Sequence, residues 1–281
     1  MKTYKTGAFK SPFDLRTFGY VPTKARYVHS AGLQYPEKYI KNQFSVGTCT
    51  ATSATQHAGK ALDKKWSDDF QYLCQKKFID GNWLEGSSAF SACKVMHQIG
   101  LLPEEEWTHT TQEDKKLPYQ QYIAKLNSIS EAELQRLILI ANKYKIKGYS
   151  KLPDVKRDTI ANAIADNPNV GIITRYVIGS EWYQEPIEPL RAPKNPISGH
   201  LVNDTKVVGM SFRIANVWGK IWGDKGTAYY NYNDIRPTEA WVVYYNELPK
   251  EIQVQVESRE QVIGKILAYI QQIIALLVKL K

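Results

Sequence analysis

The sequence predicts an α+β protein with a helical lobe, then an antiparallel β lobe, then one more helix. Three observations predict this class. Helix-period apolar patterns dominate residues 39–143, and β-rich runs joined by Gly, Asp and Asn turns dominate residues 144–248. A linker and an amphipathic helical pattern fill residues 249–281. Because helical and β-rich runs are segregated along the chain, we expect two packed lobes, the second a sheet curled into a half-barrel.

The composition is that of a globular protein, and the distribution of its charges argues against nucleic acid as a partner. The chain has 281 residues, 43% of them apolar, and a formal net charge of +9. Lys and Arg alternate with Asp and Glu, and no run reaches five like charges. This pattern favours a solvated basic surface over nucleic-acid binding. The first 16 residues contain no apolar stretch long enough for a secretory signal.

The N-terminal half begins with an extended arm. Residues 1–38 contain Pro12, Pro22 and Pro36 among scattered aromatic residues, so we expect extended chain there. Small residues then dominate a helix predicted over 48–64, and this helix should allow neighbouring backbone to approach closely. Further helical patterns cover about 67–78, 88–99 and 130–144.

The second half is predicted to be mostly β. A proline-rich loop with Pro186, Pro189, Pro193 and Pro196 leads to Gly199 and His200. One helix is expected at 153–166. Strands are expected at 144–149, 170–177, 206–210, 212–217, 227–231 and 241–245.

The tail carries an amphipathic helical pattern. Ser258 to Gln261 has the form of a capping box, and Ile or Leu follows at heptad a and d spacing from Ile263 to Leu280. Lys265, Gln271 and Gln272 interrupt any transmembrane span. The apolar stripe leaves three partners open: identical helices, a groove on another protein, or a membrane surface. Isoleucine at both a and d favours a homo-oligomer, as a trimer or tetramer.

Cys49 is the first candidate for chemistry. It precedes a small-residue helical run, so its thiol is expected at a helix N-terminus, where backbone N–H groups and the helix dipole stabilise a thiolate. The other two cysteines, Cys74 and Cys93, lie beside apolar residues in helical segments. Reduced core thiols are therefore expected for both, rather than a disulfide.

Two downstream residues complete a recognisable pattern. His200 and Asn216 follow Cys49 by 151 and 167 residues, and Gln43 precedes it by six. Asn216 is followed by Trp-Gly-x-x-Trp-Gly-x-x-Gly, which contains Trp218 and Trp222. In these four features, in this order, residues 36–246 resemble the papain-like cysteine peptidases.

Two departures indicate the branch that the chain resembles. Val46 stands where secreted members have a disulfide cysteine, and Thr50 stands where plant and animal members have Trp. The closer resemblance is to papain-like proteins of bacteria and phages that lack a pro-segment. It implies a cytoplasmic or virion-associated protein that hydrolyses peptide bonds and needs no cofactor.

The resemblance also implies a role for each site residue. Cys49 would attack the peptide carbonyl as a thiolate that rests as an ion pair with His200, and Asn216 would orient the histidine ring. The Gln43 side chain would donate a hydrogen bond to the oxyanion. In the alternative interpretation its amide only caps a loop. Trp218 would shield the His–Asn hydrogen bond, Trp222 would line the leaving-group side, and the Gly86 backbone would pair with substrate; packing and turn roles remain open for these three.

Other sites have weaker support. His29, His57, His97 and His109 show no metal-ligand spacing with Cys or carboxylates, so no metal site is expected. The alternative function is a phage or bacterial structural or assembly protein that uses this fold for docking. Protein or peptide substrates are expected on the first reading, and the sequence leaves their cleavage specificity open.

Overall fold

The structure is a computed structural model that describes residues 5–12, 14, 18–20, 22, 26–183, 189–247 and 250–279. The chain divides into two units, Met1–Asn246, called here the main unit, and Glu247–Lys281. Helix α7 (Lys250–Lys279) makes up the described part of the second unit apart from Glu247.

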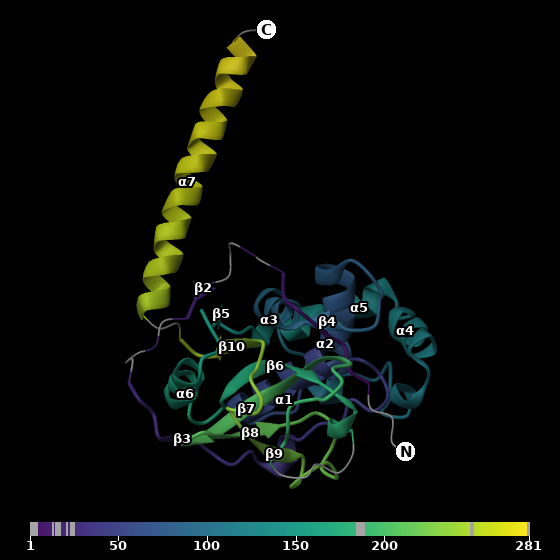
Figure 1. Ribbon diagram of the computed structural model, residues 1–281. Helices are drawn as coiled ribbons and strands as arrows, with labels where there is room; N and C mark the ends of the chain where they lie inside the picture. Colours follow the sequence, from purple (N-terminus) through teal and green to yellow (C-terminus); the bar gives the residue numbers. More distant parts are fainter. Residues whose placement is uncertain are drawn as a thin grey trace. The chain divides into compact units, whose positions relative to one another are not determined.

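Helices fill most of the first half of the main unit, as predicted. They gather on one side of it, and strands β6 to β9 lie on the other (Figure 1). The helices of the main unit are α1 (Cys49–Leu62), α2 (Asp68–Cys74), which continues as a π-helix (Gln75–Asp80), α3 (Ala89–Gln98), α4 (Tyr119–Asn127), α5 (Glu131–Ala141) and α6 (Arg157–Asp166). Short 3₁₀ turns lie at Glu37–Tyr39, Glu104–Glu106, Asp114–Lys116, Asn142–Tyr144 and Ser180–Trp182.

One large sheet forms the second half. Its strand order is β2-β5-β10-β6-β7-β8-β9, with β3 also paired to β7, and all pairs except β2–β5 are antiparallel. The strands are β2 (Phe18–Gly19), β3 (Ser30–Gly32), β5 (Gly148–Lys151), β6 (Ile172–Ile178), β7 (Ser198–Val208), β8 (Ser211–Ala215), β9 (Thr227–Asn231) and β10 (Glu239–Tyr244). A separate parallel pair joins β1 (Ala8–Phe9) to β4 (Ser87–Ser88).

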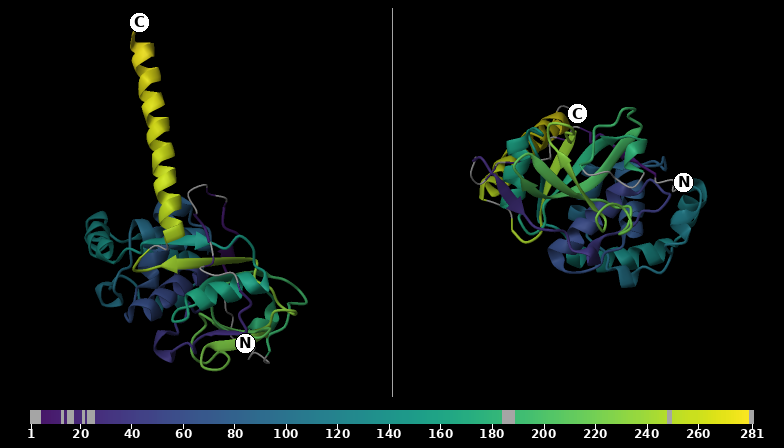
Figure 2. Two further views of the ribbon diagram at one scale, coloured as in Figure 1. Left: turned by 90° about the vertical axis from the view of Figure 1, so that its left-hand side faces the viewer. Right: turned by 60° about the horizontal axis from the view of Figure 1, so that its bottom comes forward.

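Helix α1 lies between the helical side and the sheet, where it packs against α2, α3, β6 and β7 (Figure 2). Its small residues make this position possible, since Ala51, Ala54 and Ala58 are fully buried. Two reciprocal hydrogen bonds join α1 to β7: Ser53 Oγ donates to Asn203 Oδ1 (3.0 Å), and Asn203 Nδ2 donates to the Ser53 carbonyl (3.2 Å). These bonds set the height of α1 against the strand.

Several predicted elements differ from those observed. Helix α4 was not predicted, because its apolar stripe is short and interrupted by polar residues. The strand expected at 144–149 forms only at 148–151, after a 3₁₀ turn at Asn142–Tyr144. His200 lies inside β7 and not on the loop before a strand, because pairing with β6 extends the ladder back to Ser198.

Helix α7 is longer than the tail pattern predicted. It begins at Lys250, so the capping box expected at Ser258 is wrong, since Ser258 lies within the helix. The physical reason is that residues 250–257 contain neither Gly nor Pro to end a helix. The part of the stripe with described side chains, from Ile263 to Ile274, is exposed; Leu277 and Leu280 lie outside those side chains.

Candidate active site

His200 and Asn216 form a buried hydrogen-bonded pair. His200 stands on β7, and Asn216 comes directly after β8, the neighbouring strand. His200 Nε2 lies 2.7 Å from Asn216 Oδ1, which also accepts the Val217 N–H at 2.8 Å. The Val217 N–H can only donate, so the Asn216 atom is the oxygen and His200 Nε2 carries a proton. In the neutral ring Nδ1 is then an acceptor.

Indole rings cover this pair. The Trp218 ring stacks on His200 with centroids 4.5 Å apart and planes 24° from parallel. Trp222 meets Trp218 edge-on, is buried, and donates its Nε1 hydrogen to the Trp182 carbonyl at 2.8 Å. His200 Nδ1 is buried and has no hydrogen-bond partner among the described residues. The pair therefore leaves one ring nitrogen available for proton transfer.

Cys49 is the first residue of α1 and is fully buried. It lies one helical turn before Ser53, which bonds Asn203, and Asn203 follows His200 by three residues on β7. The α1–β7 packing and a hydrogen bond between the Cys49 thiol and the backbone of Leu201 thus place the thiol against the strand that carries His200. The sequence predicted this thiol at a helix N-terminus, and the structure confirms that local position.

Gln43 directs its amide toward a carbonyl of the N-terminal arm. Its Nε2 donates to the Lys5 carbonyl at 2.6 Å and to the Val46 carbonyl at 3.0 Å. The second bond is the loop-capping role that the sequence left open. The first bond places a peptide carbonyl on the group proposed to bind the substrate oxyanion.

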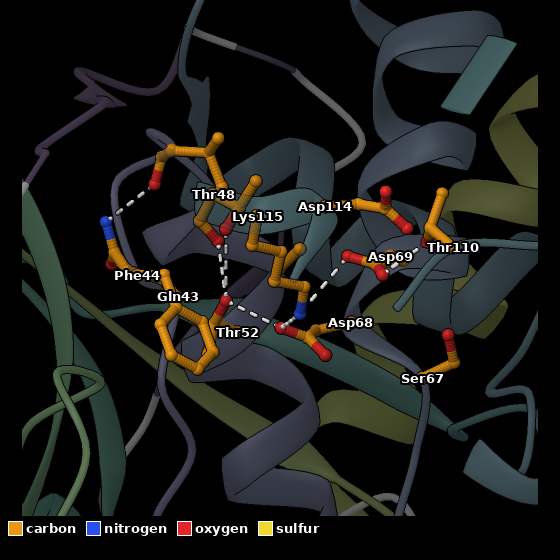
Figure 3. Close-up of polar contacts among 12 residues, drawn as sticks. Gln43, Phe44, Thr48, Thr52, Ser67, Asp68, Asp69, Thr110, Asp114 and Lys115 are labelled. Carbon is orange, nitrogen blue, oxygen red and sulfur yellow. Dashed lines mark hydrogen bonds and ion pairs between the residues drawn. The ribbon is translucent and has the colours of Figure 1, made fainter. Parts of the chain in front are cut away.

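A buried ionic network supports the loop that carries Gln43 (Figure 3). The Ser45 N–H and O–H both donate to the Lys115 carbonyl, at 3.3 and 3.0 Å. The Lys115 ammonium lies 2.7 Å from Asp68 and 3.1 Å from Asp69. Burial alone would lower the pKa of Lys115, but the two carboxylates raise it above its usual range.

The same network reaches the start of α1. Asp68 accepts a hydrogen bond from Thr52 Oγ1 at 3.0 Å (Figure 3). The Thr52 N–H donates at 3.0 Å to the carbonyl of Thr48, the residue before Cys49. Asp68 therefore joins the start of α1 to Lys115. Because the Lys115 carbonyl also accepts hydrogen bonds from the loop that carries Gln43, one ionic cluster positions both Gln43 and the start of α1, where Cys49 lies.

Residues 5–11, called here the arm segment, lie between the helical side and the sheet at this site. The Gly7 carbonyl accepts the Ser87 N–H at 2.7 Å, and the Ala8 carbonyl accepts Arg175 Nε at 2.9 Å. β1 pairs with β4 in the parallel direction. The arm segment therefore contacts Gln43, the Gly86–Ser88 loop and β6 through its own backbone.

Glycines make this close approach possible. A Cβ on Gly7 would lie 2.5 Å from the Gly47 carbonyl oxygen and 2.7 Å from the Gly86 Cα. A Cβ on Gly86 would lie 2.3 Å from the Gly7 carbonyl oxygen, and Gly86 also has φ +101°, which side chains disfavour. A Cβ on Gly199 would lie 2.0 Å from the Ala8 carbonyl oxygen.

Burial sets the charge state of the pair in this arrangement. It raises the pKa of the Cys49 thiol to about 11, although hydrogen bonds with the backbone of Leu201 and Gly7 act in the opposite direction. Burial also lowers the pKa of His200 to about 4, against the Asn216 hydrogen bond. Both shifts favour a neutral thiol and a neutral imidazole while the pair is buried, because burial removes the solvation that would stabilise two charges. The resting thiolate and imidazolium that the resemblance implied stay a prediction.

The structure places the remaining predicted residues as follows. Both main-chain groups of Gly86 are used within the chain, its N–H by the Tyr72 hydroxyl at 3.0 Å and its carbonyl by Lys76 Nζ at 2.7 Å. The main-chain donor to the arm segment is therefore the Ser87 N–H, which donates to the Gly7 carbonyl, and not a group of Gly86. The substrate roles of Gly86 and Trp222 stay predictions.

Two charged residues near the arm segment were missed from the sequence. Arg175 interrupts the apolar run of β6, and Glu239 is the first residue of β10 and is 1% exposed. For Arg175 the available signal was a charge inside the run read as a buried strand at 170–177, because such a charge needs a partner. Glu239 lies outside the strand expected at 241–245, so the pattern gave no such signal for it. All three cysteines are free and buried, which confirms the prediction of thiols. Within the described residues no cluster of His, Cys and carboxylates could hold a metal.

Several solved structures are similar to this chain and share one fold. A cysteine protease from Xylella fastidiosa, xylellain, is 23% identical, with a TM-score of 0.70 over 88% of this chain and 98% of that one. Procathepsin B S9 from Trypanosoma congolense is 12% identical (TM-score 0.58; 86% and 87% covered), and the Carica candamarcensis cysteine protease CMS1MS2 is 14% identical (0.53; 78% and 99%). No family model and no curated protein matches the sequence. The chain therefore has the papain-like fold, as its sequence predicted.

Proposed function

We propose that this chain, which has the papain-like fold, is a cysteine endopeptidase. The observation that carries the proposal is the buried His200–Asn216 pair, which lies on the sheet beside the helix that begins at Cys49. His200 Nδ1 has no hydrogen-bond partner within the part of the chain that the structure describes. A histidine whose ring is oriented by an amide and shielded by stacked indole is arranged as a base. A thiol at a helix N-terminus is the matching nucleophile.

The proposed reaction needs only groups of the chain and water. The Cys49 thiol passes its proton to His200 Nδ1, and the thiolate sulfur bonds to the substrate carbonyl carbon. Gln43 Nε2 and the Cys49 backbone N–H donate to the oxygen that becomes negative. The C–N bond then breaks as His200 protonates the leaving amine. Water, deprotonated by His200, attacks the acyl-enzyme, and the thiolate leaves and recovers its proton.

The arm segment is incompatible with substrate in this scheme. Lys5 presents its carbonyl to Gln43 Nε2, the donor that the substrate oxygen would use. The Gly7 carbonyl uses Ser87 N–H, which an extended substrate would also use. Catalysis therefore requires the arm segment to leave. Its departure would also admit water, and so permit the charged thiolate and imidazolium.

A single substitution in the full chain tests this proposal. Gly7→Val places a side chain within 2.5 to 2.7 Å of backbone atoms and should expel the arm segment. Gly19→Val is the matched control, because a Cβ there meets nothing within 4 Å. At pH 6 we expect iodoacetamide to label Cys49 about 100-fold faster in Gly7→Val than in Gly19→Val. Mass spectrometry separates Cys49 from Cys74 and Cys93.

Cleavage completes the test. Gly7→Val should hydrolyse casein, and adding Cys49→Ser should stop it. If Cys49 of Gly7→Val reacts only as an ordinary thiol of pKa about 8.5, or if the protein labels rapidly but cleaves no peptide of a library, the endopeptidase proposal is wrong. A docking role for the fold would then be favoured.

The tail supports a further proposal about partners, namely that α7 self-associates as a trimer or tetramer. Ile263, Ile266, Ile270 and Ile273 keep heptad spacing and are each about half exposed. Binding to a membrane surface is the rival. Among the described helices, none combines the length and apolarity needed to cross a bilayer.

A further inference from the structure

The π-helix that continues α2 carries a buried lysine. Lys76 is 1% exposed, and the Gly81 N–H donates to its carbonyl at 3.1 Å, which closes the wide π-turn. Such turns are rare and lie frequently at functional sites. A buried ammonium is also costly unless acceptors surround it, so the contacts of Lys76 show what this turn holds in place.

Three acceptors surround the Lys76 ammonium. Its Nζ lies 2.7 Å from the Gly86 carbonyl oxygen, 3.0 Å from Asp80 Oδ2 and 3.3 Å from Asn82 Oδ1. An ammonium has three N–H groups, so each acceptor takes one. The Tyr72 hydroxyl reaches the same Gly86 carbonyl only at 3.5 Å. Within the part of the chain that the structure describes, Lys76 is therefore the main donor to that carbonyl.

The Gly86 carbonyl and the Ser87 N–H belong to one peptide unit. In a trans peptide these two bonds point in opposite directions within one plane. Lys76 holds one side of the unit, while the Ser87 N–H on the other side donates to the Gly7 carbonyl at 2.7 Å. A cation at the carbonyl polarises the unit, which makes the N–H a stronger donor. Because Gly86 has φ +101° and no side chain, its peptide would turn easily without this bond.

The same π-helix contacts the helix that carries the candidate nucleophile. Gln75, the residue before Lys76, accepts the Thr50 hydroxyl through Oε1 at 2.8 Å. Thr50 follows Cys49 on α1, and the Gln75 and Thr50 side chains are both fully buried. One element therefore sets the position of the Ser87 N–H relative to the start of α1.

We propose that Lys76 is a positioning residue, which directs and polarises the Ser87 N–H so that this group binds a main-chain carbonyl of extended peptide. In the unchanged chain that carbonyl belongs to Gly7; for a substrate, the inference rests on the proposed peptidase function. Lys76 then has two effects: it retains the arm segment, and it binds substrate once the arm segment has left. The competing explanation is an ion pair with Asp80 that only stabilises the fold.

Removing the cation together with its carboxylate tests the proposal without leaving a buried carboxylate unpaired. The test variant is Lys76→Met with Asp80→Asn in the full chain. Asp80→Asn alone is the first control, because it keeps the ammonium and its bond to the Gly86 carbonyl. Lys77→Met is the second control, because Lys77 is an exposed lysine of the same π-helix that pairs with Glu131.

Two measurements apply to the chain that retains its arm segment. The amide proton shift of Ser87 in NMR spectra reports its hydrogen bond to Gly7, and it should move upfield in the double variant. Labelling of Cys49 by iodoacetamide should become about tenfold faster there, since the arm segment loses the strength of one hydrogen bond. Both controls should keep the shift and the labelling rate of the unchanged chain.

Hydrolysis gives the opposite sign when the arm segment is expelled. In the Gly7→Val background, the double variant should raise KM for extended peptides about tenfold and leave kcat unchanged. The reason is that the Ser87 N–H binds a carbonyl away from the scissile bond, equally in the ground state and in the transition state. A lower kcat with unchanged KM would place the effect at Cys49 and would overturn the proposal.

The Ser87 shift decides between positioning and simple stabilisation. If it is unchanged in the double variant, Lys76 forms only a structural ion pair and the proposal is wrong, even if labelling becomes faster. If circular dichroism shows that the double variant does not fold, Lys76→Gln with Asp80→Asn removes the cation but keeps a polar side chain, and the same changes are expected. If Gly7→Val cleaves no peptide, the peptidase function fails, whereas the Ser87 shift still tests Lys76.

Discussion

The arm segment and helix α7 lie near opposite ends of the chain and meet their partners in different ways. The arm segment is held by backbone: carbonyls of Lys5, Gly7 and Ala8 accept hydrogen bonds from the main unit. Helix α7 satisfies its own backbone and presents side chains, with Ile266 and Ile270 about half exposed.

This difference shows what kind of partner each region needs. The arm segment offers small residues and main-chain carbonyls, which suit a site that binds extended backbone. The main unit of the same chain contains that site. An apolar stripe needs another apolar surface, and each buried Ile contributes about 1.5–3 kcal/mol. Changes to backbone acceptors and donors should therefore alter the site, whereas changes to the stripe should alter assembly and leave the site unchanged.

The largest expected effect is at Gln43, because both arm and substrate would use its amide. In the Gly7→Val background, Gln43→Ala should lower kcat/KM for peptide hydrolysis about 100–1,000-fold. In the otherwise unchanged chain the same substitution should speed Cys49 labelling, since Lys5 loses its donor. Gln121→Ala, exposed on α4, is the control. A Gln43→Ala protein with unchanged hydrolysis would show that Gln43 only caps its loop.

The pH dependence of labelling should distinguish covered from uncovered thiol. With the Cys49 pKa raised to about 11 by burial, the reactive thiolate fraction in the unchanged chain should rise about tenfold per pH unit, or about 100-fold from pH 6 to 8. In Gly7→Val the rate should be nearly constant over this range, because the ion pair forms. Initial iodoacetamide rates measure both. A flat profile in the unchanged chain would contradict the burial of a neutral thiol.

A smaller effect is expected from the stripe of α7. Ile270→Ala should weaken self-association roughly 30-fold, through lost apolar burial. Gln271→Ala, exposed and outside the a and d positions, should change nothing. Sedimentation velocity over a concentration series measures both, and Cys49 labelling should be the same in all. If the full chain is monomeric and binds anionic liposomes through α7, the oligomer proposal is wrong.

The smallest effect is expected at Ser11. Ser11→Ala removes the O–H donor to Glu239 but keeps the N–H, so the arm segment should loosen and Cys49 labelling should rise about tenfold. Ser180→Ala, at an exposed serine, is the control. Labelling no faster than in the control would mean that Glu239 does not help to retain the arm segment.

The sequence was informative wherever a residue type carries its own chemistry or period. Cys49 before a run of small residues predicted a thiol at the start of a buried helix, and α1 confirms it. The segregation of helical and β patterns predicted the fold class, which the similar structures confirm. The family resemblance implied that Asn216 orients the ring of His200, and the 2.7 Å hydrogen bond shows that the two side chains meet. Their catalytic roles stay predictions.

Tertiary structure alone decided what covers the site. Ser11 and Glu239 are 228 residues apart, and a serine in an extended segment has no pattern that names a distant carboxylate. The arm segment binds through main-chain carbonyls, which every residue has, so periodicity could not reveal it. The raised pKa of Cys49 and the lowered pKa of His200 follow from their burial, because the pKa of a group depends on the solvent around it, which the order of residues along the chain does not specify.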